Sequence, residues 1–207
     1  MFQVLLRFFV VFLVVVEPVS LIPVFVALTA HATERQRRQM ARRAVLVAAI
    51  ILTLFSVAGA PLLRLMHISI DSFRIFGGLL LFLMALEMVF ARPSGTRTSQ
   101  PEEVESLRRQ DISVFPLAFP FIAGPGALAT ILLAFGEGTD RLAMFVGLIA
   151  CMFLVLLITL VAMYVASPIM RVLGVTGANV INRLTGVLLG ALAVQFVIDG
   201  LRGSFGS

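Results

Sequence analysis

The chain has 207 residues, of which 60% are hydrophobic and 13% are charged, and its mean hydropathy is +1.07. These values exclude a soluble globular domain and indicate an integral membrane protein. All 16 basic residues are arginine and the net charge is +5. Because the arginines punctuate apolar segments, they fit an anionic membrane surface better than a nucleic acid.

The sequence contains little that could carry metal, redox or covalent chemistry. Its one cysteine, Cys151, lies in an apolar run and cannot form a disulfide within the chain. His31 lies in a polar loop and His67 at a segment end, and neither has a second ligand type at metal-binding spacing. We therefore expect no metal site, no cofactor and no catalytic residue, and we do not expect an enzyme.

The first apolar run, residues 4–28, contains the stretch Glu17-Pro18-Val19-Ser20-Leu21-Ile22-Pro23. Proline removes a backbone donor and breaks a helix, and a carboxylate in hydrocarbon is unfavourable by several kcal/mol. The run is much longer than the core of a cleaved signal peptide, so we expect a retained, interrupted span. A basic loop, residues 30–43, follows it.

Two more apolar runs complete the first half of the chain. Residues 44–66 and 73–90 are each close to the roughly 20 residues that cross a bilayer as a helix. The polar stretch after them, residues 92–113, is expected to be a solvated linker. The chain therefore divides into a first three-helix unit, residues 1–91, this linker, and a second three-helix unit, residues 114–207.

The second unit repeats the pattern of the first. Its first run, residues 114–135, is interrupted by prolines and glycines, and residues 142–166 and 184–201 are two further expected spans. The last span contains Gly186 and Gly190 in a GxxxG motif, which favours close packing inside the protein over a dimer face.

The two units match at a constant offset. A spacing of 107 residues separates three pairs of positions: Pro18 and Pro125, Pro61 and Pro168, and Arg64 and Arg171. Because each unit has an odd number of spans, the second unit must enter the bilayer from the opposite face. The expected fold is all-α: a polytopic membrane protein with six transmembrane helices as two inverted three-helix repeats, in which helices 1 and 4 are discontinuous.

The two interruptions predict a polar site inside the bilayer. A helix that restarts in the membrane has unpaired N–H groups and a positive dipole end, which suit an anion or a carbonyl. We expect an N-cap before the proline at each break, and symmetry brings the breaks together near the midplane. The candidate substrate-binding residues are Glu17, Pro18, Ser20, Pro23, Gly124, Pro125, Gly126 and Thr130.

Two interpretations of the first break stay open. In one, Glu17 only caps its own half-helix and the prolines are tolerated kinks. In the other, the paired breaks line a substrate or ion site in which Glu17 is a proton carrier or a ligand. Other hydroxyl side chains in apolar segments, such as Ser56 and Thr159, are expected to bond to carbonyls of their own helix.

On these motifs the sequence resembles the MarC family of bacterial and archaeal inner-membrane proteins. The first stretch is similar to the family pattern Asp-Pro-x-Gly-x-x-Pro, with Glu17 and Ser20 at the aspartate and glycine positions. Residues 116–127 match Pro-Leu-Ala-x-Pro-x-x-x-Gly-Pro-Gly-Ala throughout. The resemblance covers essentially the whole chain and implies membership of the lysine-exporter-like (LysE) superfamily, whose characterised members export small molecules.

We therefore predict a secondary transporter that exports a small polar molecule or ion across the inner membrane by alternating access, with proton coupling as an added hypothesis. No GxxxxGK[ST] motif occurs, so ATP is not expected to drive it directly. The alternatives are a non-transporting scaffold or accessory subunit and a membrane-embedded enzyme. The expected partners are the lipid bilayer and an unidentified substrate, with no nucleic acid and no oligomeric state assigned.

The arginine distribution predicts the orientation. Eleven arginines lie on the side of residues 92–113 and five on the other side. Basic residues are in excess on the cytoplasmic side of membrane proteins, so we expect this linker in the cytoplasm and both termini outside it.

Overall fold

The computed structural model describes residues 1–90, 111–136 and 142–205, which form helices without a strand. Five stretches in these ranges are long and apolar enough to cross a membrane, or six if one bent pair is a single span. The expected all-α, multi-span fold is confirmed. The helices are α1 (Phe2–Val16), α2 (Pro18–Leu28), α3 (Glu34–Leu65), α4 (Ile70–Phe90), η1 (Ser113–Ile122), α6 (Pro125–Gly136), α7 (Leu142–Tyr164) and α8 (Ala166–Phe205).

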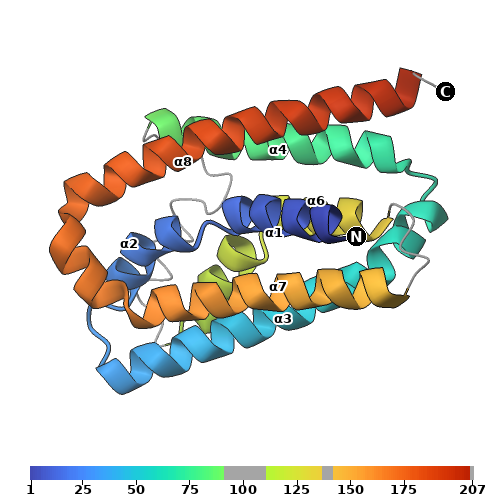
Figure 1. Cartoon of the computed structure of the whole chain (residues 1–207). Coiled ribbons are helices and arrows are strands. Elements are labelled where there is room, and N and C mark those ends of the chain that lie inside the picture. The colour runs from blue at the N-terminus through green and yellow to red at the C-terminus, as the bar shows by residue number, and fades with distance from the viewer. Residues whose placement is uncertain (91–110, 137–141, 206–207) are drawn as a thin grey trace.

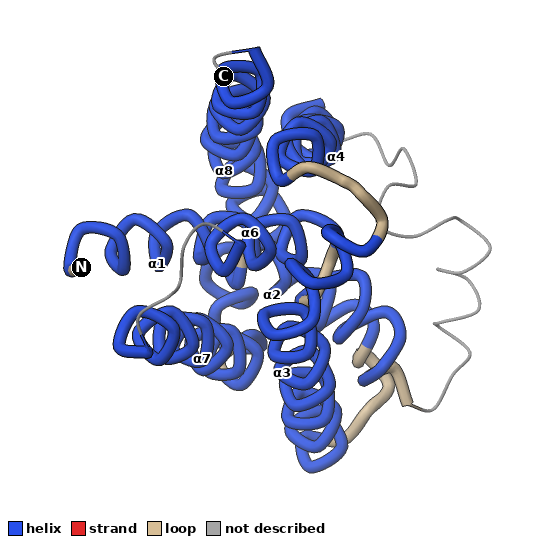
Figure 2. The backbone as a smooth tube through the Cα atoms, turned by 90° about the vertical axis from the view of Figure 1, so that its right-hand side faces the viewer, coloured by secondary structure: helices blue, strands red, loops and turns tan. Residues whose placement is uncertain are grey.

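The helices form three layers. Figure 1 shows α4 and α8 side by side along one edge, α3 and α7 along the opposite edge, and α1, α2 and α6 between them. The view along the helices shows the same order, with α6 and α2 near the centre (Figure 2). The helices α1, α2 and α6 therefore lie in the middle layer between the two edge pairs, and η1 contacts α3.

The helices α4 and α8 are antiparallel and closely packed. A Cβ atom added to Gly186 would lie 3.2 Å from the Ala85 carbonyl oxygen, and one on Gly190 would lie 3.5 Å from Ala85 Cβ. At the other end of the pair, a Cβ on Gly200 would lie 2.7 Å from Ile75 Cγ1. The GxxxG motif thus faces α4, and the prediction that it packs internally is confirmed.

Two helices begin earlier than their apolar runs. The basic stretch 30–43 is not a loop throughout, because α3 begins at Glu34. Thr33 and Gln36 form a reciprocal capping box there, with the Thr33 N–H donating to Gln36 Oε1 at 2.8 Å. Similarly, α8 begins at Ala166 and not at residue 184, and it bends at Gly174, whose φ of 60° and ψ of −179° only glycine adopts readily.

The contacts of the two halves correspond. In the first half, α1 and α2 contact α7, and α2 contacts α8. In the second half, η1 and α6 contact α3, and α6 contacts α4. Exchanging α1, α2, α3 and α4 for η1, α6, α7 and α8 converts one set of contacts into the other. Residues 92–110 of the expected linker lie outside the described residues.

Candidate functional site at the two helix breaks

The first break is a single residue. Glu17 lies between α1 and α2 with φ 52° and ψ 58°, a left-handed conformation that is uncommon for a residue other than glycine. Its N–H donates to the Leu13 carbonyl at 3.1 Å, and its carbonyl accepts from the Leu21 N–H at 3.2 Å. The main chain of Glu17 therefore ends one helix and starts the next, with Pro18 as the first residue of α2.

The residues before the second break differ from those before the first, but the helix after it starts in the same way. The axes of η1 and α6 differ by 55°. Phe115 and Phe119, which precede prolines, have extended backbones with φ −127° and −133° inside η1, because a following proline disfavours the helical conformation. The helix α6 begins at Pro125, and the Leu128 N–H donates to the Gly124 carbonyl at 3.0 Å. This bond is equivalent, at the 107-residue offset, to the one between Leu21 and Glu17.

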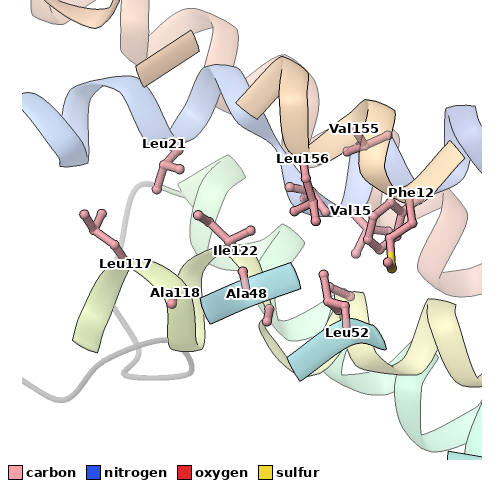
Figure 3. Packing of buried hydrophobic residues seen from close by; sticks show 14 of the residues in the cluster. Phe12, Val15, Leu21, Ala48, Leu52, Leu117, Ala118, Ile122, Val155 and Leu156 are labelled. Carbon is pink, nitrogen blue, oxygen red and sulfur yellow. The ribbon is translucent and has the colours of Figure 1, made fainter. Parts of the chain in front are cut away.

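The start of α6 lies against the end of α1. A Cβ atom on Gly126 would lie 3.2 Å from Val15 Cγ1 and would overlap Leu81 Cδ2 of α4. Gly126 therefore permits a close approach that a larger residue would prevent. Figure 3 shows that Leu21 of α2 and Ile122 of η1 belong to the same buried cluster. The two breaks are thus neighbours inside the helix bundle.

Polar side chains are buried at this place. The exposed fraction is 3% for Glu17, 9% for Ser20 and 3% for Thr130. Glu17 is the N-cap residue of α2, and its side chain makes no capping hydrogen bond to that helix. Pro18, Gly124 and Gly126 are buried, whereas Pro23 and Pro125 are half-buried.

Ser20 differs from the other buried hydroxyls. Ser56 donates to the Thr53 carbonyl at 2.8 Å and Thr159 to Val155 at 2.9 Å, so the prediction of own-helix bonds is confirmed for these two. Thr130 makes the same kind of bond, to Gly126 at 2.9 Å. Within the described ranges, Ser20 Oγ has no hydrogen-bond partner. A buried hydroxyl without a partner is unfavourable in an apolar interior. Ser20 Oγ is therefore a buried polar atom at the breaks whose hydrogen-bonding capacity is unmet.

A layer of arginines at the start of α3 joins the two halves of the chain. Arg37 Nε donates to the Thr29 carbonyl at the end of α2 at 3.0 Å, and its Nη1 donates to Ser167 Oγ at 2.9 Å. Arg42 Nε donates to the Tyr164 hydroxyl at 2.6 Å. In the sequence these arginines indicated only a positive charge. The one feature that could have indicated a partner for Arg42 is the single tyrosine of the chain, Tyr164, near the end of an apolar run.

A third bond in this layer reaches the start of η1. Arg43 Nη1 lies 2.7 Å from Asp111 Oδ2. The side chain and the N–H of Ser113 also donate to Asp111, and these bonds, together with the guanidinium, hold the pKa of the Asp111 carboxyl below its usual value. Asp111 is therefore ionised at neutral pH and ties η1 to α3.

The sequence that forms these breaks can be compared with known protein families. A model of the MarC family of integral membrane proteins matches residues 2–205. The chain belongs to this family. The resemblance inferred from the two proline motifs is thus confirmed over nearly the whole length.

The relatives in this family match nearly all of the chain. The UPF0056 membrane protein YhcE of Escherichia coli is 36% identical over 99% of this chain and 94% of its own length. A UPF0056 membrane protein of Aquifex aeolicus is 37% identical over 92% and 88%, and YvbG of Bacillus subtilis is 32% identical over 99% and 97%. Their names describe membrane proteins and no activity. No solved structure matches the chain.

Proposed function

We propose that this chain is a secondary transporter that exports a small polar molecule or ion across the inner membrane. The observation that carries the proposal is the contact of Gly126 with Val15, which makes the two helix breaks neighbours in the middle layer. Paired interruptions in the two halves of a membrane protein are typical of transporter binding sites. Glu17 and Ser20 are also buried at the first break. Such polar side chains are unfavourable in hydrocarbon, which supports a functional role for them.

The two halves act as inverted repeats that rock against each other around this site. The corresponding contacts of α2 with α7 and α8, and of α6 with α3 and α4, support this arrangement. The excess of arginine on the side of residues 92–113 supports a cytoplasmic linker and external termini. Alternating access then exposes the breaks first to the cytoplasm and next to the outside.

The site residues have two kinds of role. Glu17 and Ser20 contact the solute directly. The N-termini of α2 and α6, with their first N–H groups and the positive ends of their helix dipoles, point toward it. Thr130 keeps acceptor capacity on its hydroxyl, because its proton goes to the Gly126 carbonyl. The prolines and glycines shape the backbone around the solute: Pro18, Pro23, Gly124, Pro125 and Gly126.

An accessibility scan tests the proposal without knowledge of the solute. Single cysteines along residues 17–23 and 123–130, in a Cys151→Ala background, are treated with a membrane-impermeant maleimide from each side of sealed vesicles. We expect positions at both breaks to react from both sides, as alternating access requires. A cysteine at exposed Leu54 on α3 is the matched control for a lipid-facing position. Breaks that react from neither side would favour the scaffold alternative.

Proton coupling through Glu17 is a separate part of the proposal. The thiolate form of cysteine reacts with maleimide, so every labelling rate rises with pH, but this effect cancels in the ratio of the rates measured from the two sides. If protonation of Glu17 shifts the balance between inward and outward states, this ratio depends on pH for a cysteine at Ala127. We expect Glu17→Gln to remove that dependence and keep the protein folded, because glutamine has nearly the same shape. An unchanged pH dependence in Glu17→Gln would remove the proton role and leave the transport proposal standing.

A further inference from the structure

Two guanidinium groups meet over one aromatic ring where α3 and α7 pack together. Arg38 Cζ lies 5.9 Å and Arg42 Cζ 6.0 Å from the centroid of the Tyr164 ring. Arg42 also donates to the Tyr164 hydroxyl at 2.6 Å. The face of an aromatic ring attracts cations, so the two charges of α3 are held close together at the Tyr164 ring of α7.

The positive charge of this pair is only partly balanced. Arg38 pairs with Glu34 at 3.0 Å along its own helix. In residues 1–90, 111–136 and 142–205, no carboxylate lies within 4.0 Å of Arg42. The bond to Tyr164 uses Nε and leaves the two Nη groups, whose geometry suits two oxygens of a phosphate. The pair is thus prepared for an anion.

The position of the pair selects the source of that anion. Tyr164 is the last residue of α7, and Arg42 comes just before the apolar part of α3; tyrosine and arginine at span ends are typical of the membrane–water boundary. Large apolar side chains are exposed one and two turns from Arg42 and Tyr164, on the same helix faces and deeper in the bilayer. They are Leu46 and Ile50 on α3, and Leu157 and Val161 on α7. A ligand with a phosphate above and hydrocarbon below fits both features.

We propose that Arg38, Arg42 and Tyr164 bind the phosphate of an anionic phospholipid, whose acyl chains lie on the exposed apolar residues of α3 and α7. The proposal does not depend on transport, since it uses residues outside the helix breaks. It has one structural consequence: α3 belongs to the first half and α7 to the second, so the lipid holds the two halves together at this edge.

The test compares lipids on the purified full-length protein in detergent. Phosphatidylglycerol, phosphatidylcholine and inorganic phosphate are titrated separately, and the thermal unfolding midpoint and the lipid retained in native mass spectra are recorded. We expect phosphatidylglycerol to raise the midpoint and to be retained, with little effect of the other two. Arg42→Gln and Arg38→Gln should each weaken phosphatidylglycerol binding by about tenfold, the loss expected for one charge-assisted hydrogen bond.

The control variant is Arg35→Gln, which removes the same charge from an exposed position on the same helix and should bind phosphatidylglycerol as the unchanged protein does. An equal response to phosphatidylcholine, or the full shift from inorganic phosphate alone, would overturn the lipid assignment. An equal loss in Arg35→Gln would show diffuse charge attraction and overturn the site. If Arg42→Gln does not fold, Arg38→Gln decides, because its hydrogen bond stays within α3; undiminished binding there overturns the proposal.

Discussion

Ser20 shows how a helix break changes the environment of one side chain. In a continuous helix a buried serine or threonine donates to a carbonyl three or four residues earlier, as Thr130 and Thr159 do. The equivalent carbonyls for Ser20 belong to Glu17 and Val16, and the left-handed turn at Glu17 redirects the chain between them. The sequence could name Ser20 as a site residue. It could not show that its hydroxyl lacks a partner, because that depends on the backbone angles of Glu17.

A substitution at Ser20 tests whether its hydroxyl contributes to stability. We expect Ser20→Ala to leave the free energy of unfolding unchanged or to raise it by up to about 1 kcal/mol, because it removes a buried group with an unmet hydrogen bond. The matched control is Ser56→Ala, which removes a hydroxyl bonded at 2.8 Å and should lower stability slightly. Thermal unfolding in detergent measures both. A larger loss for Ser20→Ala than for Ser56→Ala would mean that Ser20 already has a structural partner.

At the scale of elements, some prolines marked helix starts, but others did not, and polar helix ends gave no signal. The helices α2 and α6 begin at Pro18 and Pro125, whereas Pro23 lies inside α2. Apolar periodicity could not detect the first turns of α3, because they are built from arginine and glutamine and start from the Thr33 cap. The extended residues inside η1 follow from Pro116 and Pro120 in hindsight, but their combined effect on the path of the chain needs the surrounding helices.

The α4–α8 contact allows a test with an internal control. A Cβ atom on Gly186 would lie 2.8 Å from Met88 Cβ, whereas one on Gly190 would meet Ala85 Cβ at an ordinary 3.5 Å. We therefore expect Gly186→Ala to lower the free energy of unfolding by about 1–3 kcal/mol through overpacking. Gly190→Ala, one turn away on the same face, should be tolerated. Thermal unfolding of the two variants checks this, and equal stability would show that the helices separate easily.

At the scale of the molecule, the sequence predicted an internal repeat but did not specify which helices are neighbours. A constant offset of 107 residues relates Pro18 to Pro125, yet the same offset is compatible with several arrangements of the helices. The layer of α3 with α7 depends on long-range contacts such as that of Arg42 with Tyr164. No periodicity in either segment specifies such a pairing.

Arg37 couples the end of α2 to the second half of the chain and provides a test at this scale. It contacts the Thr29 carbonyl and Ser167 Oγ. Arg37→Gln should loosen this edge, and we expect a cysteine at Ala127 to react about tenfold faster with maleimide added from the arginine-rich side, as the loss of two hydrogen bonds allows. Arg35→Gln is the control for charge alone. An unchanged rate in Arg37→Gln would show that this layer does not limit access.

The antiparallel contact between α4 and α8 also restricts how the protein can move. These helices come from different halves, and added Cβ atoms at both Gly186 and Gly200 would meet the opposite helix within 3 Å, near opposite ends of the pair. Sliding or parting along this line would open voids next to backbone atoms, whereas a tilt about it would preserve most of the contact. The pair is therefore suited to serve as a pivot, and a tilt about it would act most strongly at the far edge, against the contacts that bridge α3 and α7.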